Sequence, residues 1–279
     1  MAIFLFVLVF AAGAAKPLHL DDIEFARGAE RTAHTGIPVY YHGETIPRMP
    51  GLYHPPLYMY VLAAWMRLFG EGAAQIRLLG LTCAIWHGLV VLAIVRTIFG
   101  PATAWRWMPW FWIVFLLNPF TLQTASISDI DSSIYGPLLC AALLAVLRLS
   151  WRDGEWRTDR IARWEYGLIA ASLMLCLWAT LTTVLLILPF VFLLMIARLG
   201  VKRAAMASST TVAAAVAGFL ASYWLYGKVT GLNIGFTFDF LWESFTRRGA
   251  LGTTGLAAGL QARWQNFTGM VPFMIRWIG

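Results

Sequence analysis

Two pairs of aspartates carry the clearest potential for chemistry in this sequence. Asp21 and Asp22 are adjacent, and Asp129 and Asp131 stand close together in a short polar stretch between two apolar segments. Carboxylates at the boundary of an apolar segment cost desolvation unless water, a cation or a partner satisfies them. If both pairs met in one cavity, a carboxylate could act as a general base, tuned by the neighbouring acid or by a bound cation. Each pair could instead be an ordinary solvated loop.

A histidine followed by two prolines is the second notable motif. It lies in GLYHPPLYMY, residues 51–60, directly before an apolar run. Pro55 and Pro56 have a fixed φ and no backbone N–H, so a helix can begin only at or after them. His54 is thereby held at a defined junction. It could line a reaction site, or it could be a plain structural joint.

The composition indicates the class of protein in which these residues lie. Of 279 residues, 59% are hydrophobic and only 13% are charged, and the mean hydropathy is +0.68. Soluble domains are closer to half apolar and a quarter charged. With several long apolar runs as well, the sequence predicts an all-α, multi-pass transmembrane helical bundle. The net charge of +7 is then explained by basic loops, and no nucleic-acid-binding motif is present.

The apolar segments and their loops predict a topology. The segments cover 1–15, 74–95, 107–125, 133–149, 166–198, 205–226 and the tail from 270. Short loops between them are rich in arginine around 96–106, 148–163 and 198–203, whereas the turns at 126–132 and 178–183 contain no Lys or Arg. The positive-inside rule places the basic loops in the cytoplasm. The long loops 16–73 and 227–269 then face outward, as expected for a bacterial inner (plasma) membrane protein with an outward-facing site.

Two segments leave alternatives open. Segment 166–198 exceeds the roughly 20 residues that one span needs, so it is either a hairpin that turns near WATLTT or one long tilted helix. The basic loops fall on one side only with the hairpin. Segment 1–15 is either a first membrane helix or, because of AAGAAKP, a signal peptide that is cleaved; it lacks a basic n-region.

The first outer loop is predicted to hold two helices at the membrane surface. The stretch 21–36 has Ile23, Ala26, Ala29 (or Glu30) and Ala33 on one face, and Gly36 is expected to end the helix. A second helix follows the prolines and ends at Gly70 or Gly72. It is too short to span a bilayer, and its Tyr and Trp residues suit an interface. Its helically spaced apolar residues are Leu57, Tyr60, Val61, Ala64, Trp65 and Leu68.

This order of elements resembles the GT-C glycosyltransferases that use polyprenyl-phosphate sugars, in particular the protein-mannosyltransferase and aminoarabinose-transferase-like group. Asp21–Asp22 is similar to the acidic pair of that group, and Phe25 and Gly36 match an aromatic and a turn residue. The HPPL stretch from His54, with Tyr58 or Tyr60, matches a second signature. SDIDSSIYGPLLCAALLAVLRL (128–149) resembles the second outward acid followed by a span. The resemblance covers about residues 1–150, and the layout of the 166–198 hairpin agrees with it. The whole chain, residues 1–279, is expected to form a single transmembrane domain.

The resemblance implies an inverting sugar transfer on the outer face. Asp21 or Asp22 would be the general base, with Asp21 preferred because it aligns with the more regular acid of the motif. His54, Tyr58, Asp129 and Asp131 would bind substrate. No cofactor is certain, but a divalent cation could be held by Asp21, Asp22 and His54. The partners would be a lipid-linked sugar donor, membrane lipid, and a protein, lipid or glycan acceptor.

The sequence departs from the family in two ways. Relatives often have a Lys-Gly pair at the outward hairpin turn, whereas residues 179–183 read ATLTT, without a cation. Either contact with the donor phosphate is expected from an arginine such as Arg247 or Arg248, or the donor differs from that of the family. Family members also usually continue with further spans, so a longer parent protein is expected. The rival interpretations are a transporter or lipid flippase that binds ions or protons at the outer acids, and a non-catalytic membrane scaffold.

Overall fold

The structure is a computed structural model. It describes residues 6–8, 10–11, 18, 20–38, 54–118, 121, 134–152, 155–156, 163–181, 191–193, 195–196 and 199–247. Within these ranges, the side chains of 20–22, 149–150, 152, 155–156, 163, 240 and 243–247 lie outside the description.

The described chain is helical apart from one very short hairpin, which confirms the all-α class. Strands β1 (Trp151–Arg152) and β2 (Glu155–Trp156) form that antiparallel hairpin, with Trp151 opposite Trp156. The helices are α2 (Leu20–Thr35), α3 (Leu57–Phe69), α4 (Ala73–Phe99), α5 (Pro101–Leu117), α7 (Gly136–Ser150), α8 (Arg163–Ala179), α10 (Val201–Thr230) and α11 (Gly235–Arg247).

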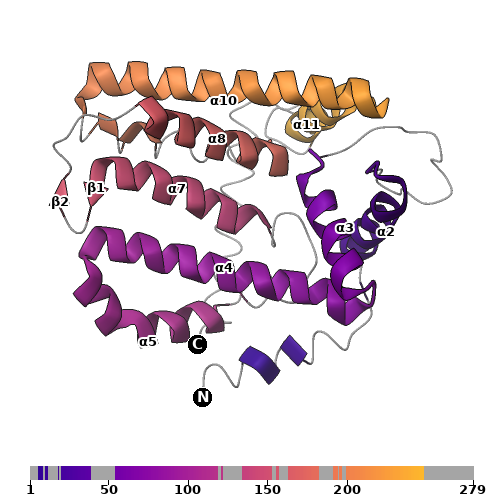
Figure 1. The fold of residues 1–279 in the computed structure, drawn as a ribbon, viewed down its shortest axis with the longest axis horizontal. Helices are drawn as coiled ribbons and strands as arrows, with labels where there is room; N and C mark the ends of the chain where they lie inside the picture. Colours follow the sequence, from indigo (N-terminus) through magenta and orange to yellow (C-terminus); the bar gives the residue numbers. More distant parts are fainter. Residues whose placement is uncertain are drawn as a thin grey trace.

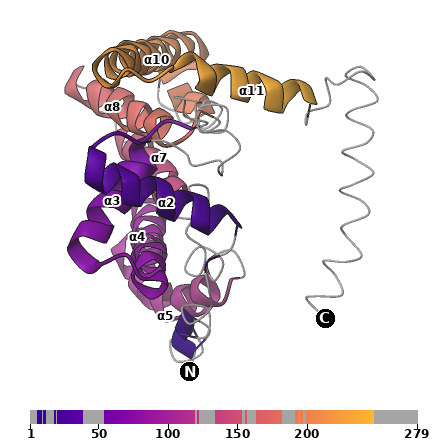
Figure 2. The same cartoon turned by 90° about the vertical axis from the view of Figure 1, so that its right-hand side faces the viewer.

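Helices α4, α7, α8 and α10 lie side by side as one layer, and α5 packs on the far side of α4 (Figure 1). The β1–β2 hairpin closes one end of the layer, where the Trp151 indole N–H donates to the Ile98 carbonyl at 3.1 Å. Helices α2 and α3 pack on each other at the opposite end, beside the start of α4 (Figures 1 and 2). We refer to this second region as the α2–α3 end.

Two of these helices, α4 and α10, are long and apolar enough to cross a membrane. In the most apolar stretch of each, only 28% is buried inside the chain, so most of its side chains are at least partly exposed. The core helix of a soluble protein would show the opposite pattern. Exposed tryptophans and leucines continue this apolar surface onto α5, where Trp105, Trp107 and Trp110 are more than half exposed.

Several predicted segments coincide with helices. The segments 74–95 and 205–226 are the central parts of α4 and α10, and 133–149 corresponds to α7. The single long helix considered for 166–198 is wrong, because α8 ends at Ala179 and Thr180 and Leu181 leave the helix. The end of α8 falls in the predicted turn region at 178–183. The predicted loop 227–269 begins late, since α10 continues to Thr230.

Proline precedes the start of α3, and glycine follows the ends of α2 and α3. Pro56 precedes α3, and its carbonyl accepts a hydrogen bond from the Tyr60 N–H at 3.1 Å. Gly36 follows α2 with φ 74°, and Gly70 follows α3 with φ 95°, conformations that residues with a Cβ rarely adopt. The predicted boundaries of both helices are therefore confirmed.

The predicted apolar face is the buried face on α2 but not on α3. On α2, the predicted alanines Ala26, Ala29 and Ala33 are buried, together with Phe25. On α3, the apolar residues singled out by their spacing lie outside the buried face: Leu57, Val61 and Trp65 are half-buried against the edge of the core, and Leu68 is 76% exposed. The opposite face is the buried one, because it packs on α2 and α4. It consists of Tyr58, Met59, Leu62, Ala63 and Met66.

Candidate functional site

The acidic pair of the sequence analysis lies at the start of α2. Asp21 and Asp22 occupy the first turn of this helix, and their side chains lie outside the described structure. Acidic residues are stabilised at such positions, because the helix dipole is positive at its N-terminus. The buried alanine face fixes α2 against α3 and so determines where this first turn lies within the α2–α3 end.

The HPP motif is built into the same end of the molecule. His54 is half-buried, and Pro55 and Pro56 are buried. Tyr58, two residues further on, is fully buried with its ring 5.2 Å from that of Phe25 in an edge-to-face contact. In this structure Tyr58 holds α3 on α2, while its role in binding substrate stays a prediction. The aromatic Phe25, which the sequence pattern included, thus has a packing partner in the HPP motif itself.

A cavity of about 410 Å³ lies between α2 and α3. Its polar lining comes from Thr32 on α2 and from Tyr60 and Arg67 on α3. Tyr60 donates from its hydroxyl to the Gly36 carbonyl at 3.1 Å. The Arg67 guanidinium donates through Nη2 to the Ala33 carbonyl, one of the last carbonyls of α2. A cation at a helix C-terminus is favourable, so Arg67 stabilises the end of α2 while lining the cavity.

A second cavity, of about 460 Å³, lies where α10 passes into α11. It is lined by Lys228, Trp224, Asn233 and neighbouring apolar residues. The Lys228 ammonium stands 5.7 Å from the centre of the Trp224 ring, a cation–π distance. This cavity therefore offers one cation, one amide and an aromatic face, which are the groups that bind a hydroxylated or anionic ligand.

Tyrosines connect the helices that carry the two cavities. The hydroxyls of Tyr60 on α3 and Tyr226 on α10 lie 3.1 Å apart, and Tyr226 stacks on Tyr223. The Tyr223 hydroxyl lies 2.6 Å from that of Thr237 on α11. The first cavity is thus joined to α10 and α11 by hydroxyl contacts, which the spacing of the sequence did not indicate.

The side chains of the remaining predicted site residues lie outside the described part of the chain. Asp129, Asp131 and Arg248 lie outside the described residues. Arg247 is the last residue of α11, and its side chain also lies outside the description. The structure therefore brings His54 and Tyr58 into the same end as the start of α2, and leaves the other assignments as predictions.

One basic residue at this end escaped the sequence analysis. Arg77, in the first turns of α4, is only 2% exposed and neighbours the buried Ile76 of the core that joins α2, α3 and α4. Its signal was present in the sequence, because a single arginine stands inside the apolar segment 74–95. A charged residue buried at the edge of an apolar segment is a candidate for function.

The described side chains contain no group of three His, Cys, Asp or Glu residues that could hold a metal ion. Of the three predicted metal ligands, only the side chain of His54 falls within the described part of the chain. A hard divalent cation would need the carboxylates of Asp21 and Asp22, since oxygen ligands suit such ions. The cation thus stays a prediction that depends on the first turn of α2.

A solved structure shares this arrangement of helices. The crystal structure of ArnT from Cupriavidus metallidurans in the apo state superposes with a TM-score of 0.63 at 16% sequence identity. The fold is GT-C-like. The match covers 85% of this chain and 43% of that chain, so the present chain spans less than half of the length of ArnT. No family model and no curated protein matches the sequence.

Proposed function

We propose that the chain forms the membrane part of a glycosyltransferase that takes its sugar from a polyprenyl-phosphate donor. The observation that carries the proposal is the GT-C-like fold, because the match to the ArnT structure covers 85% of the chain. The proposal also uses the acidic first turn of α2 and the HPP motif, which lie at one end of the bundle. The motifs in the sequence resemble those of GT-C glycosyltransferases, which is consistent with this fold.

In the proposed reaction, an acceptor hydroxyl or amine attacks the anomeric carbon of the sugar. The new bond forms as the bond between this carbon and the phosphate oxygen breaks, so the configuration inverts and the lipid phosphate leaves with the bonding electrons. Asp21 or Asp22 takes the proton of the acceptor as general base. Arginine side chains stabilise the negative charge on the departing phosphate, a task assigned to Arg247 or Arg248 by the sequence.

The distribution of charge supports an outward-facing site. Arg96 lies in the last turn of α4, Arg148 in the last turn of α7, and Lys202 in the first turn of α10. All three turns lie at the end of the bundle that carries the β1–β2 hairpin (Figure 1). The α2–α3 end lies opposite (Figure 1). Since basic loops stay in the cytoplasm, the α2–α3 end is proposed to face the outer side of a bacterial inner membrane.

The decisive experiment supplies radiolabelled polyprenyl-phosphate sugar to membranes that contain the full-length protein. Wild-type protein is expected to transfer label to an endogenous acceptor, and Asp21→Asn or Asp22→Asn is expected to lower the rate by about 100-fold or more, the contribution typical of a general base. Glu30→Gln is the matched control, because Glu30 is an exposed acid on the same helix. Unchanged transfer in both Asp variants would refute the catalytic assignment.

Two further outcomes separate the alternatives. Loss of transfer on treatment with EDTA, restored by Mg²⁺ or Mn²⁺, would establish the predicted divalent cation. Movement of the intact labelled lipid across the bilayer without any sugar transfer would support the flippase instead. In that case Asp21→Asn and Asp22→Asn would change lipid translocation, because the acids would bind ions or protons.

A further inference from the structure

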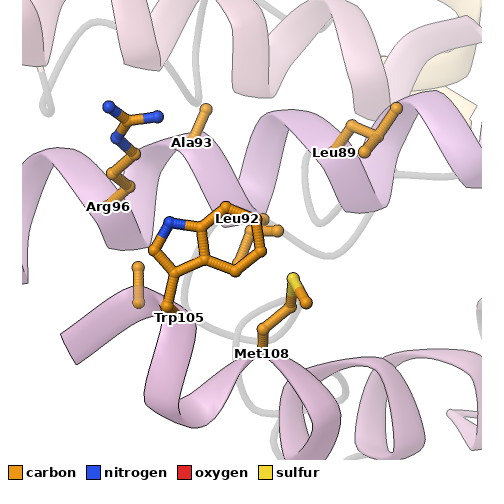
Figure 3. Close-up of a pocket in the computed structure, with 7 residues that line it drawn as sticks. Leu89, Leu92, Ala93, Arg96, Trp105 and Met108 are labelled. Atoms are coloured by element: carbon orange, nitrogen blue, oxygen red, sulfur yellow. The ribbon is translucent and has the colours of Figure 1, made fainter. Parts of the chain in front are cut away.

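A third cavity lies far from the α2–α3 end, between the last turns of α4 and the first turns of α5. It measures about 200 Å³. Figure 3 shows Arg96 at one extremity of its α4 wall and Leu89 at the other, with the Trp105 indole between the two helices and Met108 beside it. The cavity therefore has one charged extremity and an apolar remainder. None of the chemistry proposed above uses it.

We infer that this cavity binds one anionic glycerophospholipid, with the lipid phosphate at Arg96 and an acyl chain along Leu92 and Leu89. The first reason is the order of the lining residues along α4. This helix is long and apolar enough to span a membrane, and Arg96 lies in its last turn, where a headgroup would lie. Leu92 and Leu89 follow one and two turns deeper, at the depth of the acyl chains.

The second reason is the charge at the polar extremity. Arg96 is exposed, and in the part of the chain that the structure describes its guanidinium forms no ion pair and no side-chain hydrogen bond. A guanidinium presents a planar fork of donors that matches phosphate oxygens. Other basic residues gather at the same end of the bundle, including Arg148 and Lys202. A headgroup with net negative charge complements this surface better than a zwitterionic one.

The third reason is the surface around the mouth of the cavity. Leu89 is 53% exposed and Trp105 is 65% exposed, so the cavity opens onto an apolar surface that a bilayer would cover. Tryptophan is enriched at the membrane interface because its ring is apolar and its N–H is polar. A soluble anion would leave the leucine and methionine wall without a partner. A phospholipid satisfies both parts of the cavity at once.

Native mass spectrometry of the full-length, detergent-solubilised protein tests the inference. Titration with phosphatidylglycerol is expected to give one saturable adduct, and phosphatidylcholine of the same chain length is expected to bind at least fivefold more weakly. Arg96→Gln should weaken phosphatidylglycerol binding by about fivefold or more, the effect of one basic residue near an anionic lipid. Arg106→Gln is the matched control, because it removes the same charge from an exposed residue of α5 that does not line the cavity.

A second variant tests the apolar part of the cavity. Ala93 lines the wall between Arg96 and Leu89, so Ala93→Trp should fill the space and reduce binding while Arg96 is kept. The inference is overturned if the two lipids bind equally, if Arg96→Gln binds like wild type, or if Arg106→Gln loses as much affinity as Arg96→Gln. Displacement of the lipid by millimolar inorganic phosphate would also overturn it, because the site would then be one for a soluble anion.

Discussion

The hydroxyl of Tyr60 lies 3.1 Å from the hydroxyl of Tyr226, and this contact links α3 to α10 across 166 residues of sequence. Tyr60 also donates to the Gly36 carbonyl at 3.1 Å. A phenol has one proton, so the Tyr60 proton is used by Gly36 and the Tyr226 hydroxyl donates to the Tyr60 oxygen. Tyr60 therefore ties both the end of α2 and the end of α10 to α3.

This asymmetry predicts an order of stability for two variants. Tyr60→Phe removes both hydrogen bonds and should lower the free energy of unfolding by about 1–2 kcal/mol, whereas Tyr226→Phe removes one bond and should cost about 1 kcal/mol or less. Thermal unfolding of the purified protein in detergent should therefore rank wild type above Tyr226→Phe, and Tyr226→Phe above Tyr60→Phe. The reverse order of the two variants would contradict the assigned direction of the hydrogen bonds.

The packing of α4 on α5 depends on a glycine. A Cβ at Gly88 would lie 2.5 Å from the Trp112 ring and 2.9 Å from Phe115. Gly88→Ala should therefore destabilise the protein by about 1–3 kcal/mol through overpacking. Gly167→Ala on α8 is the control, because no atom lies within 4 Å of its Cβ position, and alanine there should be neutral or slightly stabilising. Equal melting temperatures for the two variants would refute this contact.

Arg67 is expected to stabilise the end of α2. Its guanidinium donates to the Ala33 carbonyl, so Arg67→Gln should cost about 1 kcal/mol and raise amide hydrogen exchange in the last turn of α2. Arg31→Gln removes the same charge from an exposed position on α2 and should leave exchange in that turn unchanged. Similar exchange in both variants would mean that the Arg67 hydrogen bond does not stabilise the last turn of α2, and that only the loss of a positive charge matters.

Cysteine labelling tests the proposed orientation. In a background where Cys83, Cys140 and Cys176 are replaced by alanine, His34→Cys places a thiol on an exposed position of α2, and Lys202→Cys places one at the start of α10. In intact right-side-out vesicles, a membrane-impermeant maleimide should label position 34 at once and position 202 only after permeabilisation. Labelling in the opposite order would reverse the topology.

His54 is expected to contribute to transfer but not to membrane insertion. Under the proposed function, His54→Ala should lower the transfer rate by roughly tenfold or more, which corresponds to the loss of a hydrogen bond to a charged group. The amount of protein in the membrane fraction should stay the same. His34→Ala is the control, since His34 is exposed in the last turn of α2. Full activity in His54→Ala would leave this histidine a structural role only.

Local chemistry was enough to predict where α3 begins and where α2 and α3 end. Pro56 has no backbone N–H and cannot donate a hydrogen bond inside a helix. Gly36 and Gly70 adopt a positive φ, which ends a helix and is rare for other residues. These boundaries therefore depend on single residues. The apolar character of α4 and α10 follows from their composition in the same way. The acidic first turn of α2 and the HPP junction are likewise features of short stretches.

The buried face of α3 could not be predicted, because two faces of this helix are apolar. Leu57, Val61 and Leu68 recur at helical spacing, and so do the residues that are buried in the structure. Only the docking of α2 and α4 selects the face with Tyr58 and Leu62 for the core. In a membrane protein the outer face is also apolar, so hydrophobicity alone does not separate protein contacts from lipid contacts.

The sequence by itself therefore determined the helical class, the glycine and proline boundaries, and the motifs that resemble polyprenyl-phosphate-sugar transferases. The tertiary structure alone decided that Tyr60 meets Tyr226, that Arg77 is buried beside the α2–α3 core, and that Arg96 stands at the end of an apolar cavity. The physical reason is the separation along the sequence between the residues that interact. Turns and helix ends depend on the backbone preferences of a few neighbouring residues, whereas these contacts arise when helices distant in sequence pack together.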